Sequence, residues 1–322
     1  MTGLSVGNQL DHYRIDELIA RSGMASIFRA IDLNDGKQVG IKLPHPEMEC
    51  DPLLFDRFKR EIEIGVKLNH PGVMKVYDNE KRSRVYMVME WVDGKLLRRI
   101  FGPQHKLPVD RAVYLTIQVL KALDYIHANG VVHRDLKPEN IMVDSDDNIK
   151  LIDFGIAGNE GSRRLTFAKL SNVMGTPDYI SPEQVKGKRG DGRADIYAVG
   201  VMLYEMLTGK MPFEGPNQFA IMNERLLNNP IPPREVDPSI TPELQEIIYR
   251  ALERDPANRY PTAREFIHDL EHQNEVGVAD REELRNWKVR KTGTAKKILT
   301  YVGLILIPIV VFTLLLWVAR KA

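Results

Sequence analysis

The stretch VVHRDLKPENIMVDSDDNIKLIDFG, residues 131–155, decides the fold of this chain. Its two apolar runs, IMV and IKLI, flank the polar turn DSDDN and predict an antiparallel β-hairpin. Such a hairpin brings the polar residues at its two open ends together, and these are Asp135, Lys137, Asn140 and Asp153. Two carboxylates, an amide and an ammonium group at one place suit the binding of a metal-bound polyphosphate.

The composition of the chain is that of a globular protein. Its 322 residues, 43% hydrophobic and 28% charged, are enough for one large or two medium-sized domains. The formal net charge is +1 and the sequence shows no basic stripe, so we expect no nucleic-acid partner. The single cysteine, Cys50, excludes an intrachain disulfide and has no metal-ligand spacing around it, which favours a cytosolic location for most of the chain.

The C-terminal run ILTYVGLILIPIVVFTLLLWV, residues 298–318, carries no charge along its length. As a helix it would be about 31 Å long and would cross a hydrocarbon core of about 30 Å. Basic residues are more numerous before this run than after it, so the positive-inside rule places the N-terminal portion in the cytoplasm. We predict a single-pass, tail-anchored protein, with a basic juxtamembrane linker at 273–297 and a short tail at 319–322. A buried core helix is the alternative.

The N-terminal part has the pattern of a small β-rich lobe. Apolar runs of strand length occur at 13–20, 26–30, 38–43 and 85–92. Between the last two runs, a helical pattern places Phe58 and Ile62 on one apolar face. Glu61 lies at the edge of that face and Glu63 almost opposite it, so Glu61 is predicted to be the partner of Lys42.

Helical patterns dominate after residue 94. They occur at about 110–128, 194–208, 216–228, 241–253 and 261–272. Pro-rich connections such as NPIPP at 229–233 separate them. We therefore expect an α+β fold with a β-rich N-lobe at 13–90 and a larger helical C-lobe at 94–272.

Taken together, these motifs resemble those of the eukaryotic-like, bacterial-type serine/threonine protein kinases. HRDLKPEN at 133–140 matches the catalytic loop of that family in full, and DFG follows at 153–155. The resemblance covers about residues 13–270. It implies a two-lobed protein kinase fold at 13–272, to which we add one C-terminal transmembrane helix at 298–318.

The resemblance also implies roles for the residues of the catalytic loop. Asp135 would accept the proton of the attacking hydroxyl group, and Lys137 would steady the transferred phosphoryl group. Asn140 belongs to the same catalytic set and, together with Asp153, would hold Mg²⁺, with Mn²⁺ as an alternative metal. The nucleotide would be ATP.

The nucleotide site implied by the resemblance lies mainly in the N-lobe. VGIK at 39–42 resembles the V-A-I-K strand of the family, so Lys42 and Glu61 would form its ion pair. Met89 resembles the gatekeeper, and Glu90 to Val92 resemble the hinge that binds adenine. The ATP-binding residues expected besides Lys42 and Glu61 are Ile19, Ala20, Ser22, Gly23, Ile27, Glu90 and Val92.

One element departs from the family. The phosphate-covering loop should read G-x-G-x-x-G-x-V, whereas residues 20–27 read ARSGMASI, so that small residues replace all three consensus glycines. Glycine allows a close approach of the backbone to phosphate that a side chain impedes. We expect weaker ATP binding or a stiffer loop, with catalysis retained. Gly65 also leaves little side chain to pack against Phe154, so its helix is expected to seat less firmly.

Downstream motifs of the C-lobe complete the resemblance. SPE at 181–183 resembles the A-P-E element, Arg259 resembles the arginine that pairs with Glu183, and Asp195 resembles the buried helix aspartate. GTP at 175–177 resembles the segment that receives the substrate serine or threonine.

The segment between Asp153 and Glu183 contains hydroxyl residues beside basic ones. Because Arg134 precedes Asp135, and this arginine often pairs with a phosphorylated residue in the family, we expect autophosphorylation at Thr166 or Ser171. A homodimer would allow this transfer in trans. An ordinary solvated loop is the alternative.

The sequence therefore predicts a membrane-anchored serine/threonine kinase that phosphorylates proteins in the cytoplasm, anchored in a bacterial inner or cell membrane. One alternative is a membrane-tethered pseudokinase scaffold that binds partners without turnover, a reading favoured by the glycine-poor loop. Another is a receptor for an external signal, for which residues 319–322 are too short to fold a sensor.

Overall fold

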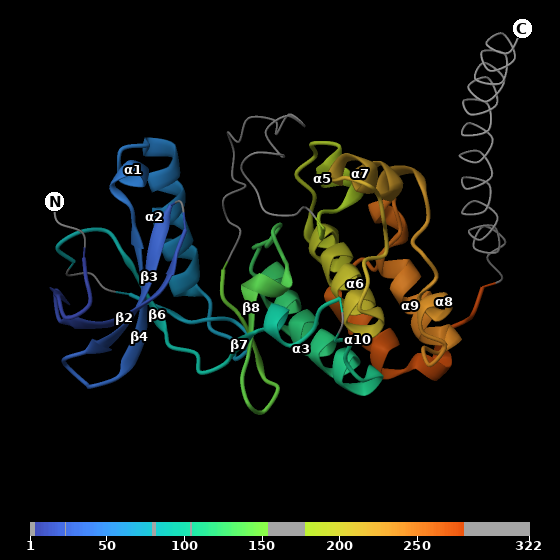
Figure 1. Ribbon diagram of the computed structural model, residues 1–322, viewed down its shortest axis with the longest axis horizontal. Helices are drawn as coiled ribbons and strands as arrows, with labels where there is room; N and C mark the ends of the chain where they lie inside the picture. The colour runs from blue at the N-terminus through green and yellow to red at the C-terminus, as the bar shows by residue number, and fades with distance from the viewer. Residues whose placement is uncertain (1–3, 23, 79–81, 104, 154–177, 280–322) are drawn as a thin grey trace, which may run out of the picture. The chain divides into compact units, whose positions relative to one another are not determined.

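The computed structural model describes residues 4–22, 24–78, 82–103, 105–153 and 178–279 (Figure 1). The elements below all belong to one compact unit, Met1–Gly277. Among the described residues, no helix combines the length and the apolar character needed to cross a bilayer. The predicted membrane segment at 298–318 lies outside the described residues.

The N-lobe is built on a six-stranded antiparallel sheet with the order β1-β2-β3-β4-β6-β5. Its strands are β1 (Gln9–Leu10), β2 (Tyr13–Arg21), β3 (Ala25–Asp32), β4 (Gln38–Pro44), β5 (Val76–Tyr77) and β6 (Met87–Glu90). Two helices, α1 (Pro46–Glu49) and α2 (Pro52–Lys67), follow β4. The strand-like runs of the sequence thus form one sheet, as predicted.

Helix α2 begins at a well-formed cap. The carboxylate of Asp51 accepts hydrogen bonds from the backbone N–H groups of Leu53 and Leu54, and Pro52 occupies the first helical position, where no N–H is required. Its buried residues Phe58 and Ile62 pack into an apolar cluster with the methionines of β6. The opposite face of the sheet has a second, separate cluster.

Gly65 brings α2 very close to β5. A Cβ atom at this position would lie 2.5 Å from Cγ2 of Val76 and 3.0 Å from its Cβ. Phe154, the residue expected to lack a packing partner here, lies outside the described residues. The loose seating expected at Gly65 concerns a contact with Phe154 and stays a prediction, while Val76 fills the space on the described side of the glycine.

The C-lobe is arranged around helix α6 (Gly192–Thr208), which is buried along almost its whole length. Helices α3 (Val109–Ala128) and α9 (Pro242–Ala251) pack against α6, and α10 (Ala263–Glu271) packs against both α3 and α9 (Figure 1). The shorter helices are α5 (Pro182–Val185), α7 (Gln218–Leu227) and α8 (Pro233–Val236). Single 3-10 turns are η1 (Leu97–Arg99), η2 (Pro138–Asn140), η4 (Pro256–Asn258) and η5 (Gln273–Glu275).

The predicted hairpin is confirmed. Strands β8 (Ile141–Val143) and β9 (Ile149–Leu151) pair in antiparallel register, and β7 (Lys95–Leu96) adds a third strand beside β8. The carboxylate of Asp144 accepts hydrogen bonds from the N–H groups of Asp146 and Asn148 and closes the turn. Leu151 also bonds to the N-lobe side, because its N–H donates to Gly72 O and its carbonyl accepts from Met74 N, both at 2.9 Å.

The two-lobed α+β architecture predicted from the sequence is therefore present. The small lobe is rich in strands, the large lobe is helical, and the helices near 110–128, 194–208 and 261–272 all form. The hairpin lies where the two lobes meet, and this position determines which side chains can reach one another.

The contact between Gly65 and Val76 yields a stability prediction. We expect Gly65→Ala to lower the free energy of unfolding by about 1–3 kcal/mol, because the added methyl group overlaps Val76 and the helix must shift. Urea denaturation measures this change. The loss caused by Gly65→Ala should be smaller in a Val76→Ala background than in the unaltered chain, since the two sites are coupled.

Gly102→Ala is the matched control, because no atom lies within 4 Å of the added Cβ. Its effect should stay within about 0.5 kcal/mol. Equal losses in Gly65→Ala and Gly102→Ala would contradict the proposed overlap.

Candidate active site

Lys42 is held between two carboxylates from different parts of the chain. It lies on β4, and its Nζ is 2.8 Å from Oε1 of Glu61 on α2 and 3.2 Å from Oδ1 of Asp153, which follows β9. The predicted pairing of Lys42 with Glu61 is confirmed, and Glu63 is exposed as expected. The sheet, the helix and the hairpin thus meet at one ammonium group.

The charges of this trio are set by burial and by their mutual contacts. Burial alone would lower the pKa of Lys42, but the charges of Glu61 and Asp153 raise it above its usual value. Burial raises the pKa of Glu61 to about 7 despite the neighbouring lysine. For Asp153, desolvation opposes ionisation, but the charge of Lys42 and hydrogen bonds from Lys42 and Glu61 lower the pKa overall. Of the two carboxylates, Asp153 is therefore the one that ionises more readily.

The catalytic loop places two polar side chains, those of Lys137 and Asn140, against Asp135. Lys137 Nζ lies 2.9 Å from Asp135 Oδ2, and Asn140 Nδ2 donates to the backbone carbonyl of Asp135 at 2.8 Å. The carbonyl of Asn140 in turn accepts from Ile152 N at 3.0 Å, next to Asp153. This chain of contacts brings together the four residues that the sequence placed at the hairpin mouth.

The oxygen atoms at this mouth suit a hard cation that is completed by substrate. The described residues contain no group of three or more His, Cys, Asp or Glu side chains arranged to hold a metal ion. Asp153 offers a charged carboxylate and Asn140 an amide carbonyl. Mg²⁺ is typically bound by one or two carboxylates together with phosphate oxygens, so the donor set fits a metal carried on a polyphosphate.

Asp195 on α6 fixes the backbone of the catalytic loop through hydrogen bonds. It is buried on α6 and accepts hydrogen bonds from His133 N at 2.9 Å, Arg134 N at 2.7 Å and His127 Nε2 at 2.8 Å. Arg134 has a φ of 65°, a left-handed conformation that is costly for a residue with a side chain. The buried aspartate expected at this position is confirmed, and it compensates for the strained residue before Asp135.

A buried ion pair joins the segment after the catalytic loop to the end of the lobe. Glu183 accepts from both terminal nitrogens of Arg259, at 2.8 and 2.7 Å, as the sequence predicts. The neighbouring Gln184 donates to the carbonyl of Arg134 at 2.9 Å. This fork-like pairing is geometrically specific and anchors α5 against the catalytic loop.

The residues expected around the base of the nucleotide occupy neighbouring strands. Ile27 on β3 pairs with Lys42 in the sheet, and Met89 on β6 pairs with Gly40. A Cβ atom on Gly40 would lie 2.9 Å from Cγ of Met89, so the side chain of the expected gatekeeper packs directly against the glycine. Glu90 accepts from Lys75 N and pairs with Lys150, which places it in the join between the lobes.

Some residues predicted to bind ATP lie at the edge of the site, and others lie outside the described residues. Ile19 and Ala20 are exposed at the end of β2, Ser22 is exposed beyond it, and Val92 is half-buried after β6. The positions of the predicted motifs and sites that lie outside the described residues are Gly23, Phe154, Gly155, Thr166, Ser171 and Thr176.

A charged cluster beside the catalytic loop was not predicted from the sequence. Arg98 on η1 donates to Glu139 at 3.0 Å and to the buried Glu205 of α6 at 2.9 Å, and the hydroxyl of Tyr179 contacts both Arg98 and Glu205. Glu205 stands in an otherwise apolar helix, VGVMLYEML, and this exception could have signalled a buried partner.

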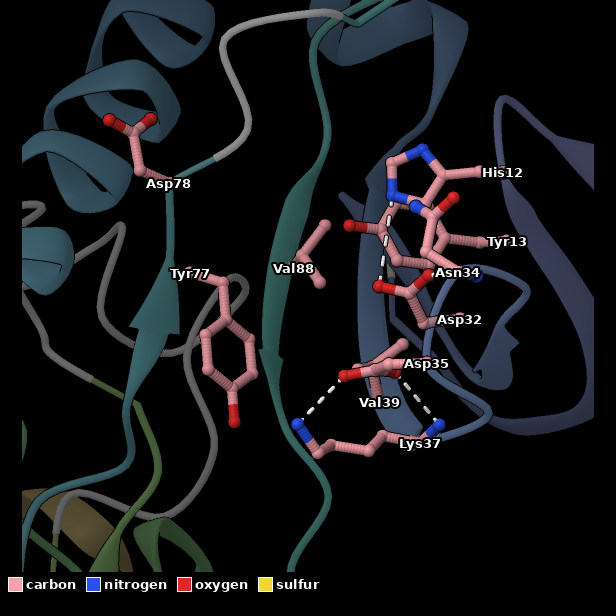
Figure 2. Close-up of a pocket in the computed structure, with 10 residues that line it drawn as sticks. All are labelled: His12, Tyr13, Asp32, Asn34, Asp35, Lys37, Val39, Tyr77, Asp78 and Val88. Atoms are coloured by element: carbon pink, nitrogen blue, oxygen red, sulfur yellow. Dashed lines mark hydrogen bonds and ion pairs between the residues drawn. The ribbon is translucent and has the colours of Figure 1, made fainter.

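A separate hollow of about 610 Å³ lies on the other face of the N-lobe sheet (Figure 2). Its wall includes Val39, whose side chain points away from the face that carries Lys42 because strand residues alternate. Two contacts between ionisable side chains lie in its wall, His12 with Asp32 at 3.7 Å and Lys37 with Asp35 at 2.7 Å (Figure 2). This hollow is not part of the site around Lys42.

Residues 13–270 match the protein kinase domain family. The chain belongs to the protein kinase family. Its curated relatives include a probable serine/threonine-protein kinase of Streptomyces coelicolor, 39% identical over 264 residues, which are 80% of this chain and 39% of the relative. Another is the serine/threonine-protein kinase PknB of Mycolicibacterium smegmatis, 36% identical over 275 residues, 84% of this chain and 44% of that protein. The chain thus spans about two fifths of the length of these relatives.

Solved kinase structures share the fold. The PknI kinase domain of Mycobacterium tuberculosis is 27% identical with a TM-score of 0.63, and the alignment covers 84% of this chain and all of that one. Rad53 in complex with AMP-PNP is 30% identical with a TM-score of 0.63, covering 80% of this chain and 64% of Rad53. The two-lobed protein kinase fold predicted from the sequence is confirmed.

The contacts of Asp195 yield a second prediction. We expect Asp195→Ala to lower the free energy of unfolding by about 2–4 kcal/mol, because it leaves one buried and one partly buried backbone N–H group without an acceptor and releases the strained Arg134. Chemical denaturation measures the loss. Asp146→Ala in the exposed hairpin turn is the control and should change the free energy by less than about 0.5 kcal/mol. A neutral Asp195→Ala variant would contradict this role.

Proposed function

We propose that the chain is a protein serine/threonine kinase, which transfers the γ-phosphoryl group of ATP to serine or threonine hydroxyls of proteins with Mg²⁺ or Mn²⁺. The observation that carries the proposal is the ammonium of Lys42 held by Glu61 and Asp153, next to Asp135 with Lys137. The names of the bacterial relatives support serine/threonine specificity.

In the proposed reaction Asp135 receives the proton of the attacking hydroxyl. Its side chain is partly exposed, so a substrate hydroxyl can approach it, and Lys137 at 2.9 Å balances its charge. Lys42 binds phosphate oxygens as a permanent cation, because Glu61 and Asp153 raise its pKa. Asn140 and Asp153 would hold the metal ion, which supplies charge neutralisation of the phosphates when bound.

The scaffold alternative has no supporting observation in the described residues. A pseudokinase would be expected to lack one of the groups that the chemistry needs, yet Lys42, Asp135, Asn140 and Asp153 are all present. Lys42 contacts Asp153, Asn140 contacts Asp135, and the carbonyl of Asn140 accepts from Ile152 N beside Asp153. The glycine-poor loop, which favoured the alternative, affects nucleotide binding and leaves the reacting groups intact.

We also infer autophosphorylation between Asp153 and Glu183, at Thr166 or Ser171. The support from the described residues is Arg134, whose Nε has no hydrogen-bond partner among them although it is buried. Burial and the nearby charge of Arg189 lower the pKa of Arg134. The negative charge of a phosphate group beside Arg134 would offset both the desolvation and the repulsion from Arg189. Transfer between two copies in a homodimer is part of this proposal.

Membrane anchoring is a proposal carried by composition alone. The uncharged run 298–318, preceded by more basic residues than follow it, supports a single-pass anchor with the kinase in the cytoplasm of a bacterium.

Phosphoryl transfer is the third prediction. Incubation of the purified full-length chain with Mg²⁺ and labelled ATP should incorporate phosphate, and Asp135→Asn and Lys42→Ala should each reduce the rate at least about 100-fold. Mass spectrometry should locate the phosphate between residues 156 and 176. A rate per molecule that rises with concentration would indicate transfer in trans.

Helix α2 supplies a matched pair of variants for the same assay. Glu61→Gln should lower the rate about tenfold or more, because the pairing with Lys42 loses its charge, whereas Glu63→Gln on the exposed face should be neutral. Undiminished transfer in Asp135→Asn would exclude the proposed role of Asp135, and no transfer by the unaltered chain would favour the scaffold.

Anchoring is the fourth prediction. The full-length chain should sediment with membranes and resist extraction by high salt, whereas a chain ending at residue 297 should be released. A protease added outside intact cells should leave the kinase domain undegraded. Degradation of that domain, or recovery of the full-length chain in the supernatant, would refute the proposed anchor or its orientation.

A further inference from the structure

The turn between β2 and β3 is closed by the hydroxyl group of Ser22. Its Oγ accepts hydrogen bonds from Met24 N at 3.3 Å and Ala25 N at 3.1 Å, and it donates to Ala25 O at 3.0 Å. Ser22 N donates to the same carbonyl at 2.9 Å. A hydroxyl has one donor and two acceptor lone pairs, and all three are used here.

Consecutive backbone N–H groups in a turn are an anion-binding arrangement. Two such donors, those of Met24 and Ala25, converge on one oxygen atom, as they would on an oxygen of a phosphate group. In protein kinases this turn covers the phosphates of the nucleotide. The oxygen that occupies the donors in this structure belongs to the chain itself, at the position where the family pattern has its second glycine.

The turn is also fixed from the side of β4. Met24 O accepts from His45 N at 2.8 Å, and the hydroxyl of Ser26 lies 2.9 Å from His45 Nε2. Both contacts leave the amide groups of Met24 and Ala25 untouched. The hydrogen bonds to Ser22 can therefore break while the turn stays attached to the strand beside it.

We propose that Ser22 sets the affinity of this site for the phosphates of the nucleotide, by acting as an internal competitor for the two amide donors. This inference rests on the proposed kinase function. Phosphate oxygens can take the hydrogen bonds of Met24 and Ala25 only after the hydroxyl of Ser22 gives them up. The weaker binding of ATP that is expected of this loop then comes from the hydroxyl group of Ser22, and removing that group should reverse it.

The test compares a ligand that has phosphates with one that lacks them. Dissociation constants of Mg²⁺–ADP and of adenosine are measured by calorimetry on the purified full-length chain, unaltered and with Ser22→Ala. Two neutral hydrogen bonds no longer compete in the variant, so it should bind Mg²⁺–ADP about three- to tenfold more tightly and adenosine as before. Weaker or unchanged binding of Mg²⁺–ADP would overturn the proposal.

Ser26→Ala is the matched control, since it removes a hydroxyl from the same turn region without touching the two amides. Its ratio of ADP to adenosine affinity should equal that of the unaltered chain, and an equal rise in both serine variants would refute a specific role of Ser22. Failure of the unaltered chain to bind either ligand would instead refute the proposed function.

Discussion

The ammonium group of Lys42 is the point on which the candidate site depends. It is the common partner of Glu61 and Asp153, which come from a helix and a hairpin that are far apart in the sequence. A buried ammonium without these partners would be costly, so the sheet, α2 and the end of β9 must approach one another before the site is stable. The site and the join between the lobes are thus the same structural feature.

The C-lobe holds the catalytic loop in place through its own buried charges. Asp195 accepts from the backbone N–H groups of His133 and of Arg134, the residue in a left-handed conformation, and Glu183 with Arg259 fixes the segment that follows. These partners come from separate parts of the C-lobe, and the side chain of Asp135 remains partly exposed beside them.

The parts of the site that could be predicted were those with local order in the sequence. Helical periodicity separated Glu61 from Glu63, and the hairpin pattern brought Asp135 near Asp153. The contact of Val76 with Gly65, the cluster of Arg98 and the hydrogen bonds of Ser22 could not be predicted. The first two depend on the directions of side chains on elements that are distant in sequence. The third depends on a hydrogen bond between a hydroxyl group and the backbone of its own turn. Neither kind of contact leaves a periodic pattern in the sequence.

The backbone of Leu151 has a mechanical consequence for the protein. Its N–H and C=O groups bond to Gly72 and Met74, while its strand belongs to the hairpin of the other lobe. Rotation of the lobes about the short connection after β6 would have to carry these two bonds with it or break them. The hairpin is therefore a second connection between the lobes, besides the chain that follows β6, and it ties Asp153 to the segment that follows α2.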